Sequence, residues 1–340
     1  MDDDRSVRNS LRLLLVALLA CLSSGCVSSR YGYGDKLNTS HDYPLPAGES
    51  QIERGRPNVV IDGVGWVLGI PSKVLLWDQR MDNHDISQKT EADLAEYLAK
   101  NELPHVKVRL NEYDPIGEWQ RLGKNKQVGA GWRYSVGALA TLGYTILPGR
   151  LFGGDNYNPF TNTISLYSDH PAVALHEGGH AKDFGQRTYK GTYGVAYLLP
   201  FVSLNHEEIA TSDALTYLAA EGKAEELEEA YVILYPAYGS HVAGNLNNAL
   251  QVNPYSWAVT LGCVIPGHII GRLKAEQAGE QVSLAQRDRK HRPGTANIAA
   301  ETASPDEKPQ WANRIETRPE TNRRDDEDVI QTKYRTLKRQ

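Results

Sequence analysis

The chain has 340 residues, of which 40% are hydrophobic and 23% are charged, proportions that are ordinary for a folded protein with a sizeable core. Lys and Arg number 37 against 42 Asp and Glu, so there is no basic surplus to neutralise a nucleic-acid backbone. The three cysteines, Cys21, Cys26 and Cys263, are too few for a disulfide framework or a thiolate zinc cluster. Composition therefore excludes fibrous, coiled-coil and polytopic membrane proteins, and argues against a nucleic-acid partner.

The N-terminus has the features of a targeting signal. Three arginines precede the apolar run Leu13–Ala20, which has the length of a signal-peptide core and is too short to span a bilayer. Small residues then lead to Cys26, in a pattern that resembles a bacterial lipoprotein signal, in which the cysteine is lipidated and becomes the mature N-terminus. Cys21 is the alternative site, and an uncleaved apolar anchor is the alternative interpretation. The lipoprotein resemblance implies that residues 1–25 are a signal peptide, and Val27 after the cysteine favours the outer membrane where one exists.

Three further regions follow this signal. Residues 26–58 are polar with scattered Gly and Pro, which predicts a flexible tether. Residues 274–340 are rich in charge and poor in large apolar side chains, so we expect this segment to be disordered. The remaining residues, 59–273, have the size of one folded domain.

Within this domain, local patterns predict several elements. Thr90 and Asp93 have the spacing of a helix-start box, and an apolar stripe follows up to Asn101. Residues Val106–Leu110 alternate between apolar and basic, which predicts a half-buried strand. A glycine-interrupted apolar stretch, Val59–Trp77, indicates close packing. Three further apolar runs are expected to be core helices, with entry into the membrane as the alternative: Gly131–Leu147, Tyr193–Leu204 and Tyr255–Ile270.

The most informative stretch is a predicted strand followed by a helix that carries an H-E-x-x-H motif. Residues Ile164–Tyr167 form a short apolar run, and Ser-Asp-His-Pro follows, with Pro171 suited to the first position of a helix. The helix should extend from Pro171 to about Phe184. This is the structural setting in which H-E-x-x-H binds zinc.

The spacing of the motif explains its chemistry. His176 and His180 are four residues apart, so both imidazoles lie on one side of the helix and can hold one zinc ion. Glu177 is placed to reach a water on the metal and to act as general base, taking its proton and passing it to the leaving amine. Gly178 and Gly179 weaken the helix but allow the preceding strand or a substrate backbone to approach it closely.

Two histidines leave the metal one protein ligand short. Asp183 and Gln186 stand where the extended metzincin motif has Gly and His, which excludes that branch. Asp183 lies too far along the same helix to be a ligand, so we expect it to support a neighbouring group or to face solvent.

A second helix offers the missing ligand. Glu207 heads a stripe of mostly small residues through Leu218, which allows close packing against the first helix and favours Glu207 as the third ligand. Glu208 and His206 remain alternatives. Asp213 is expected either to hold a zinc-binding histidine through its free N–H or to face solvent.

These two segments together resemble the gluzincin metallopeptidases. The resemblance is strongest to the membrane-associated group in which H-E-x-x-H is followed by E-x-x-A-D, and it covers roughly residues 105–220. Thr211 stands where that family has Asp. The resemblance implies an α+β, mainly helical zincin-like domain with a small sheet next to the H-E-x-x-H helix. It also implies that the strand ahead of this helix, here Thr163–Tyr167, pairs with the substrate backbone.

Downstream residues offer a donor for the oxyanion that peptide hydrolysis requires. Tyr238 and His241 are the two candidates, and helix capping or exposure is the alternative role of each. The sequence thus predicts a zinc-dependent peptidase with Glu177 as catalytic base, acting on a peptide or protein substrate at the cell envelope and anchored through Cys26. The alternatives are a zinc-dependent hydrolase of a non-peptide amide and a non-catalytic, metal-stabilised envelope scaffold.

Overall fold

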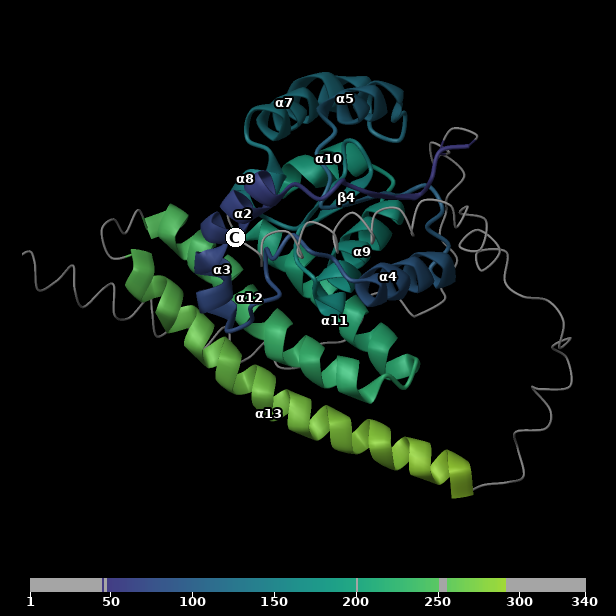
Figure 1. The fold of residues 1–340 in the computed structure, drawn as a ribbon, viewed down its shortest axis with the longest axis vertical. Helices are drawn as coiled ribbons and strands as arrows, with labels where there is room; N and C mark the ends of the chain where they lie inside the picture. Colours follow the sequence, from purple (N-terminus) through teal and green to yellow (C-terminus); the bar gives the residue numbers. More distant parts are fainter. Residues whose placement is uncertain (1–44, 46–47, 200, 251–255, 292–340) are drawn as a thin grey trace, which may run out of the picture. The chain divides into compact units, whose positions relative to one another are not determined.

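The structure, a computed structural model, describes residue 45 and residues 48–199, 201–250 and 256–291. The predicted signal peptide, Cys26 and most of the predicted tether lie outside these residues. The fold is α+β and mainly helical with a small sheet, which confirms the predicted class (Figure 1). The elements in chain order are β1 (Ile52–Arg54), α2 (Val59–Leu68), α3 (Ile70–Leu76), α4 (Gln88–Lys100), β2 (Lys107–Leu110), α5 (Pro115–Lys124), α6 (Ala130–Trp132), the π-helix η1 (Arg133–Gly137), α7 (Ala138–Ile146), α8 (Gly149–Phe152), β3 (Asn156–Asn158), β4 (Thr163–Leu166), α9 (Pro171–Gly185), α10 (Lys190–Ala196), α11 (Val202–Ala220), α12 (Ala224–Leu250) and α13 (Ser256–His291).

The strands form one mixed sheet in the order β1-β2-β4-β3. β1 is parallel to β2 and β2 is parallel to β4, with Val108 opposite Ile164, whereas β3 is antiparallel to β4. β4, the strand that leads into α9, is therefore hydrogen-bonded on both sides. The expectation that Thr163–Tyr167 pairs with a substrate backbone is wrong, because both edges of β4 are taken and β3 lies at the edge of the sheet.

Both faces of the central strands are buried, so the prediction of a half-buried strand at Val106–Leu110 is also wrong. Val108 and Leu110 face the main core. On the other face Lys107 and Arg109 are at most 2% exposed, because acidic side chains surround them. Arg109 Nε lies 3.0 Å from Oε1 of Glu118 on α5, which covers this face. Ion pairing therefore allows alternating basic residues to lie in the interior.

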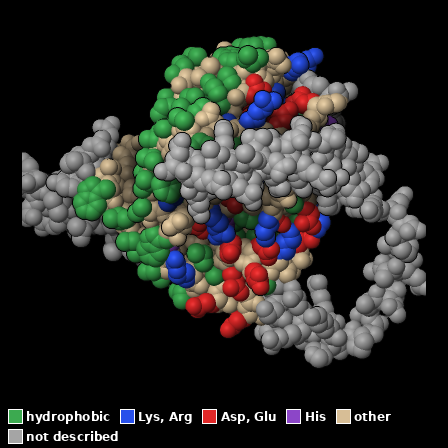
Figure 2. All heavy atoms as spheres, viewed as in Figure 1, with side chains coloured by type: hydrophobic (Ala, Val, Ile, Leu, Met, Phe, Trp, Pro, Cys, Tyr) green, Lys and Arg blue, Asp and Glu red, His purple; other side chains and the backbone are tan. Residues whose placement is uncertain are grey.

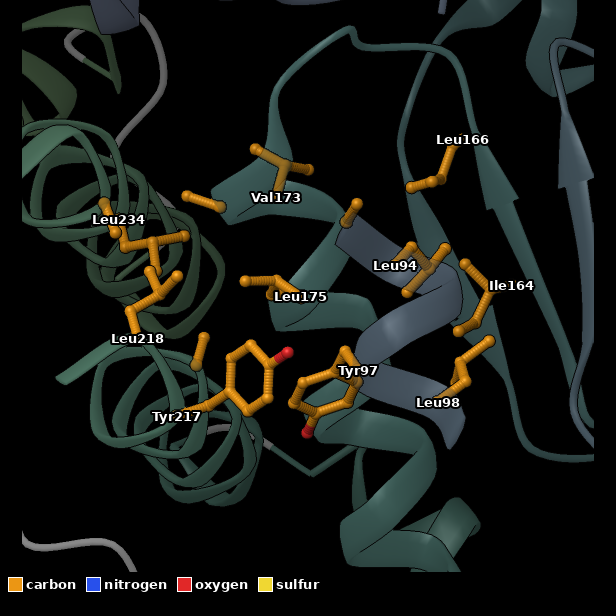
Figure 3. Close-up of a cluster of buried hydrophobic side chains, with 14 of the residues drawn as sticks. Leu94, Tyr97, Leu98, Ile164, Leu166, Val173, Leu175, Tyr217, Leu218 and Leu234 are labelled. Carbon is orange, nitrogen blue, oxygen red and sulfur yellow. The ribbon is translucent and has the colours of Figure 1, made fainter. Parts of the chain in front are cut away.

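Helix α9 lies at the centre of the fold. It packs against α4, α11, α12, β3 and β4, and its residues from Pro171 to Phe184 are all buried. The core around it combines aliphatic side chains of the sheet and α4 with Leu175 of α9 and Tyr217 of α11 (Figure 3). The ring of Tyr97 packs edge-on against Tyr217, with 4.9 Å between centroids. The metal-binding motif is thus carried by a core helix.

Helix α4 begins one turn earlier than predicted. Its N-cap is Ser87, whose hydroxyl accepts the N–H of Thr90 at 3.2 Å. Thr90 does not start the helix; its side chain donates to Oδ1 of Asp169 at 2.6 Å and so ties α4 to the segment that leads into α9.

The structure shortens both predicted flexible regions. The strand Ile52–Arg54 falls inside the predicted tether 26–58 and pairs with β2. Helix α13 continues to His291, so residues 274–291 of the predicted disordered tail 274–340 are helical, and the rest lies outside the described residues. Residues up to Gln286 belong to one unit, and Arg287–His291 belong to a second that is otherwise not described.

The three apolar runs form helices, but the expectation that they lie in the core is wrong. Leu139 of α7, Leu198 after α10 and Trp257 of α13 are 69%, 69% and 64% exposed. Val259 and Val264 of α13 are buried, but many of the large apolar side chains of these runs face outward. Among the described residues no single helix is long and apolar enough to cross a bilayer, and only α2 and α3 together, across a 47° bend, satisfy that test.

Candidate metal centre

The start and the packing of α9 fix the position of the motif. His170 is the N-cap, its Nδ1 accepting the N–H of Ala172 at 3.2 Å, and Pro171 occupies the first turn. A Cβ on Gly178 would lie 2.5 Å from the ring of Tyr97, and one on Gly179 would lie 2.9 Å from the carbonyl oxygen of Ala210. The glycines therefore admit α4 and α11, rather than the preceding strand or a substrate as predicted.

Three side chains from two helices meet at one point. His176 and His180 come from α9 and Glu207 comes from α11, and all three are buried. Nε2 of His176 lies 3.1 Å from Nε2 of His180 and 3.1 Å from Oε2 of Glu207, and Nε2 of His180 lies 3.5 Å from the same oxygen. The structure thus brings together the three predicted metal ligands.

The spacing of these atoms fits a small cation. Ligand atoms about 2.0–2.1 Å from a tetrahedral zinc ion lie about 3.3 Å from one another, and the three separations here are 3.1, 3.1 and 3.5 Å. The donor set of two imidazoles and one carboxylate also suits zinc. These residues can therefore hold a metal ion.

Hydroxyl groups position both imidazoles from behind. Oγ1 of Thr211 lies 3.3 Å from Nδ1 of His176, and Oη of Tyr197 lies 2.6 Å from Nδ1 of His180. With the proton on Nδ1 of each ring, an assignment made from these partners, both Nε2 lone pairs face the metal position. Thr211 thus reaches the first histidine from α11.

Glu207 is distinguished from its alternatives by its surroundings. Burial by itself raises the pKa of its carboxyl, but the neighbouring imidazoles of His180, His241 and His176 hold that pKa well below its usual range. Glu208 is exposed on the other side of α11. The ring of His206 is stacked on Tyr197, with 3.9 Å between centroids, so it packs behind the three ligand side chains and is not one of them.

Glu177 lies on the side of α9 that faces the edge strand. It is 6% exposed, and its carboxylate accepts the backbone N–H of Tyr157 in β3. Burial raises its pKa to about 8, although the neighbouring His176 and the Tyr157 N–H partly oppose this rise. A bound divalent cation lowers such a pKa again. The catalytic base predicted from the motif thus lies between the metal position and β3.

His241 of α12 is the better placed of the two predicted oxyanion donors. Its Nε2 lies 3.4 Å from Oε2 of Glu207, and its side chain is 48% exposed, so it borders the open side of the metal group. Tyr238 is one turn earlier on α12 and half-buried.

Neither alternative predicted for Asp213 is correct. Asp213 accepts a hydrogen bond from Nζ of Lys182 at 2.7 Å and another from the hydroxyl of Tyr97, so it joins α4, α9 and α11 instead of holding a zinc-binding histidine. Asp183 is also buried, as a neighbour of Arg187 and Tyr193.

Sequence reasoning missed Tyr197 as a partner of His180. The one signal available was the run of tyrosines between the two metal-ligand segments.

No known family model matches the chain, and neither a curated protein nor a solved structure is detectably similar to it.

Proposed function

We propose that this protein is a zinc-dependent peptidase that hydrolyses peptide bonds by activating water. One observation carries the proposal: the Nε2 atoms of His176 and His180 and Oε2 of Glu207 have the mutual spacing of a zinc ligand set, next to a buried Glu177. His241 lies beside the three ligands with its side chain 48% exposed, and we expect a fourth, exchangeable ligand on that side, as a catalytic rather than a structural zinc site has.

Each residue has a defined part in this reaction. When bound, zinc supplies Lewis-acid chemistry, since it lowers the pKa of water at the site and polarises a carbonyl oxygen. Glu177 accepts the proton of the attacking water and transfers it to the leaving amine. His241 donates a hydrogen bond to the negative charge that develops on the carbonyl oxygen.

The sequence supports a location at the cell envelope. A lipid on Cys26 would hold the domain at a membrane surface outside the cytoplasm, and Val27 favours the outer membrane where one exists. Cys26 lies outside the described residues, so this part of the proposal depends on the lipoprotein resemblance alone.

A single substitution tests the catalytic proposal. Glu177→Gln in the full-length protein is expected to abolish cleavage of a casein-like substrate while zinc, measured by atomic emission, stays at one equivalent per chain. Full activity in Glu177→Gln would refute the mechanism. An inactive wild type that binds zinc would favour the scaffold, and hydrolysis confined to small non-peptide amides would favour the other alternative.

A second pair of variants tests the ligand set. Glu207→Ala removes one of three protein ligands and is expected to lose stoichiometric zinc, because a buried two-histidine site binds zinc weakly. Glu208→Ala is the matched control, since its side chain is exposed on the same helix and should leave the zinc content unchanged. Equal zinc content in the two variants would exclude Glu207 as a ligand.

A further inference from the structure

The outward side of four connected elements is unusually apolar. These elements are α2, α3, the α7–α8 segment and α13 up to Leu273, and we call their outward side the apolar face. On α2 and α3, Val67 and Val74 are 55% and 66% exposed, and on α7 Leu139 is 69% exposed. Soluble monomers rarely expose large apolar patches of this kind without a partner.

Helices α2 and α3 are inverted relative to ordinary surface helices, because their charged side chains point inward. Oδ1 of Asp62 accepts a hydrogen bond from Nε of Arg150 at 2.7 Å. Lys73 is 7% exposed, and its Nζ donates to the carbonyl oxygens of Trp66 and Asp82 at 3.2 and 3.0 Å. These are the two charged residues of Val59–Leu76, and the Asp62 side chain is 18% exposed, so this segment presents little charge to solvent.

Helix α13 has the same inversion over its first half. Glycines face α12: a Cβ on Gly267 would lie 2.7 Å from Cα of Pro236, and one on Gly271 would lie 2.5 Å from the carbonyl oxygen of Tyr231. Five large apolar residues at a spacing of four wind along the outward side of the helix, each at least 43% exposed: Trp257, Leu261, Ile265, Ile269 and Leu273. Val259 and Val264 are buried together with the glycines, so the helix has apolar side chains on both its inner and its outer side.

Specific contacts make these surfaces continuous. The ring of Trp77, just after α3, is stacked on His268 of α13 with 3.9 Å between centroids, and α2 packs against α8. Figure 2 shows hydrophobic side chains along the top of the view, over α7, and down its left side, over α8, α2 and α3. Charged side chains gather over the lower middle of the same view.

Tryptophan placement indicates which partner the face fits. Tryptophan is usually well buried, but its amphipathic ring favours the boundary between lipid and water. Of the six tryptophans in the chain, five lie in the described residues, and each is at least 39% exposed. Trp66, Trp77 and Trp257 lie on or next to the elements of the apolar face, whereas Trp119 of α5 and Trp132 of α6 lie outside it. Trp77 also lies beside the guanidinium of Arg272, 4.9 Å from its ring, which combines an apolar contact with a cation at the rim.

From these observations we infer that the folded body itself docks on a lipid bilayer through the apolar face, with α2 and α3 lying within one leaflet. The two helices contain 10 and 7 residues, or about 26 Å if straight, and their 47° bend makes them shorter than the hydrocarbon thickness of about 30 Å. Helix formation pairs the interior backbone groups of these segments, and the Asn58 side chain accepts the N–H groups of Val60 and Ile61 at the start of α2, which lowers the cost of entry into lipid. This geometry therefore fits helices that insert into the interface between lipid headgroups and hydrocarbon, and not helices that cross the bilayer.

The chain outside the described residues favours lipid over other occupants. Its apolar run Leu13–Ala20 has eight residues, about 12 Å as a helix, which is too short to cover four helices. A lipid on Cys26 or an uncleaved anchor would instead hold the face next to a bilayer.

Tryptophan quenching tests this inference and is independent of peptidase activity. The full chain with Trp311→Phe is reconstituted into phosphatidylcholine vesicles that contain acyl-chain-brominated phosphatidylcholine. Residues 1–44 contain no tryptophan, so attachment through the N-terminus alone gives no quenching. We expect quenching and a blue shift from the body, and a further Trp257→Phe substitution should reduce the quenchable emission.

A matched pair of double variants locates the contact. Val67→Asp with Ile269→Asp places two charges on the apolar face, and should weaken bilayer contact of the body at least about tenfold and abolish quenching. Gln88→Asp with Ala99→Asp alters two exposed positions of α4 and should quench like the parent. Absence of quenching in the parent would overturn the inference, and this is the result expected if a second copy of the chain covers the apolar face. Equal quenching in both double variants would also overturn it.

Discussion

The hydroxyl of Tyr197 lies 2.6 Å from Nδ1 of His180, although Tyr197 follows α10 and His180 lies within α9. This contact fixes the orientation of the ring, so that Nε2 faces Glu207 and the metal position. The ring of Tyr197 is in turn stacked on His206, which precedes Glu207 in α11. One side chain therefore connects both ligand-bearing helices.

Tyr197→Phe keeps the ring stacking and removes only this hydroxyl. We expect the affinity for zinc to fall about 10- to 100-fold, because loss of the partner of a metal-binding histidine loosens its orientation. Competition against a chromogenic chelator measures the change. Tyr189→Phe, at a 78% exposed ring, is the control and should leave the affinity unchanged; an equal affinity for Tyr197→Phe would remove Tyr197 from the site.

Gly179→Ala tests the close approach of α9 and α11. Alanine favours a helix by about 1 kcal/mol, but its Cβ would lie 2.9 Å from the backbone oxygen of Ala210 and would push α11 away. We expect a net loss of about 1–3 kcal/mol in the free energy of unfolding, and weaker zinc binding because Glu207 moves with α11. Urea denaturation measures the first effect. Gly143→Ala, with no atom within 4 Å of the new Cβ, should stabilise the protein instead.

The buried pair of Lys182 and Asp213 provides a test of core electrostatics. Their side chains are 2% and 5% exposed and 2.7 Å apart. Asp213→Asn leaves the lysine charge without its counter-ion and should cost about 3–5 kcal/mol of unfolding free energy. Addition of Lys182→Met should recover much of this loss. Lys89→Gln removes a lysine whose side chain is 59% exposed and pairs with Asp93, and should change stability by less than about 1 kcal/mol. Comparable losses at both pairs would contradict the expectation.

We expect the protein to lose unfolding free energy in mild acid because of the buried His170. Burial, and next the nearby Arg80 guanidinium, lower its pKa to about 4, whereas an unfolded histidine has a pKa of about 6.5. Between these values the unfolded chain binds a proton that the folded protein excludes, so stability falls as the pH decreases from about 6.5 to about 4. The full effect is about 3 kcal/mol.

Urea denaturation of wild type and His170→Asn at pH 7 and pH 4.5 isolates this contribution, because asparagine can still cap α9. The variant should lose less stability on acidification than the wild type. An identical loss in both proteins would show that His170 does not titrate in this range.

The motif residues could be predicted because local rules govern them. H-E-x-x-H spacing on a helix places His176 and His180 together whatever the rest of the fold does, and Pro171 marks the start of that helix. Glu207 followed from the stripe of small residues on α11, since only close packing can bring a short carboxylate to the metal position. The mainly helical α+β class followed from the same elements.

Other features depend on contacts between distant segments, which no local pattern encodes. β1 and β3 each have three residues and exist only because longer neighbours pair with them. In the sequence, Lys107 and Arg109 have the pattern of solvent-facing strand residues. In the structure, Glu118 of α5 pairs with Arg109 and this face of the strand is covered. The apolar runs were expected in the core because hydrophobicity alone does not show whether an apolar side chain packs inside the protein or lies on its surface.

Helix α9 is buried along its length from Pro171 to Phe184, so the proposed metal site would take up its ion within an already folded core. The imidazoles are held by core packing and by hydroxyl partners, so an incoming ion meets a preformed receptor and does not have to nucleate the surrounding chain. Metal loss and global unfolding are then separate events, and stripped protein should accept a new ion without being refolded.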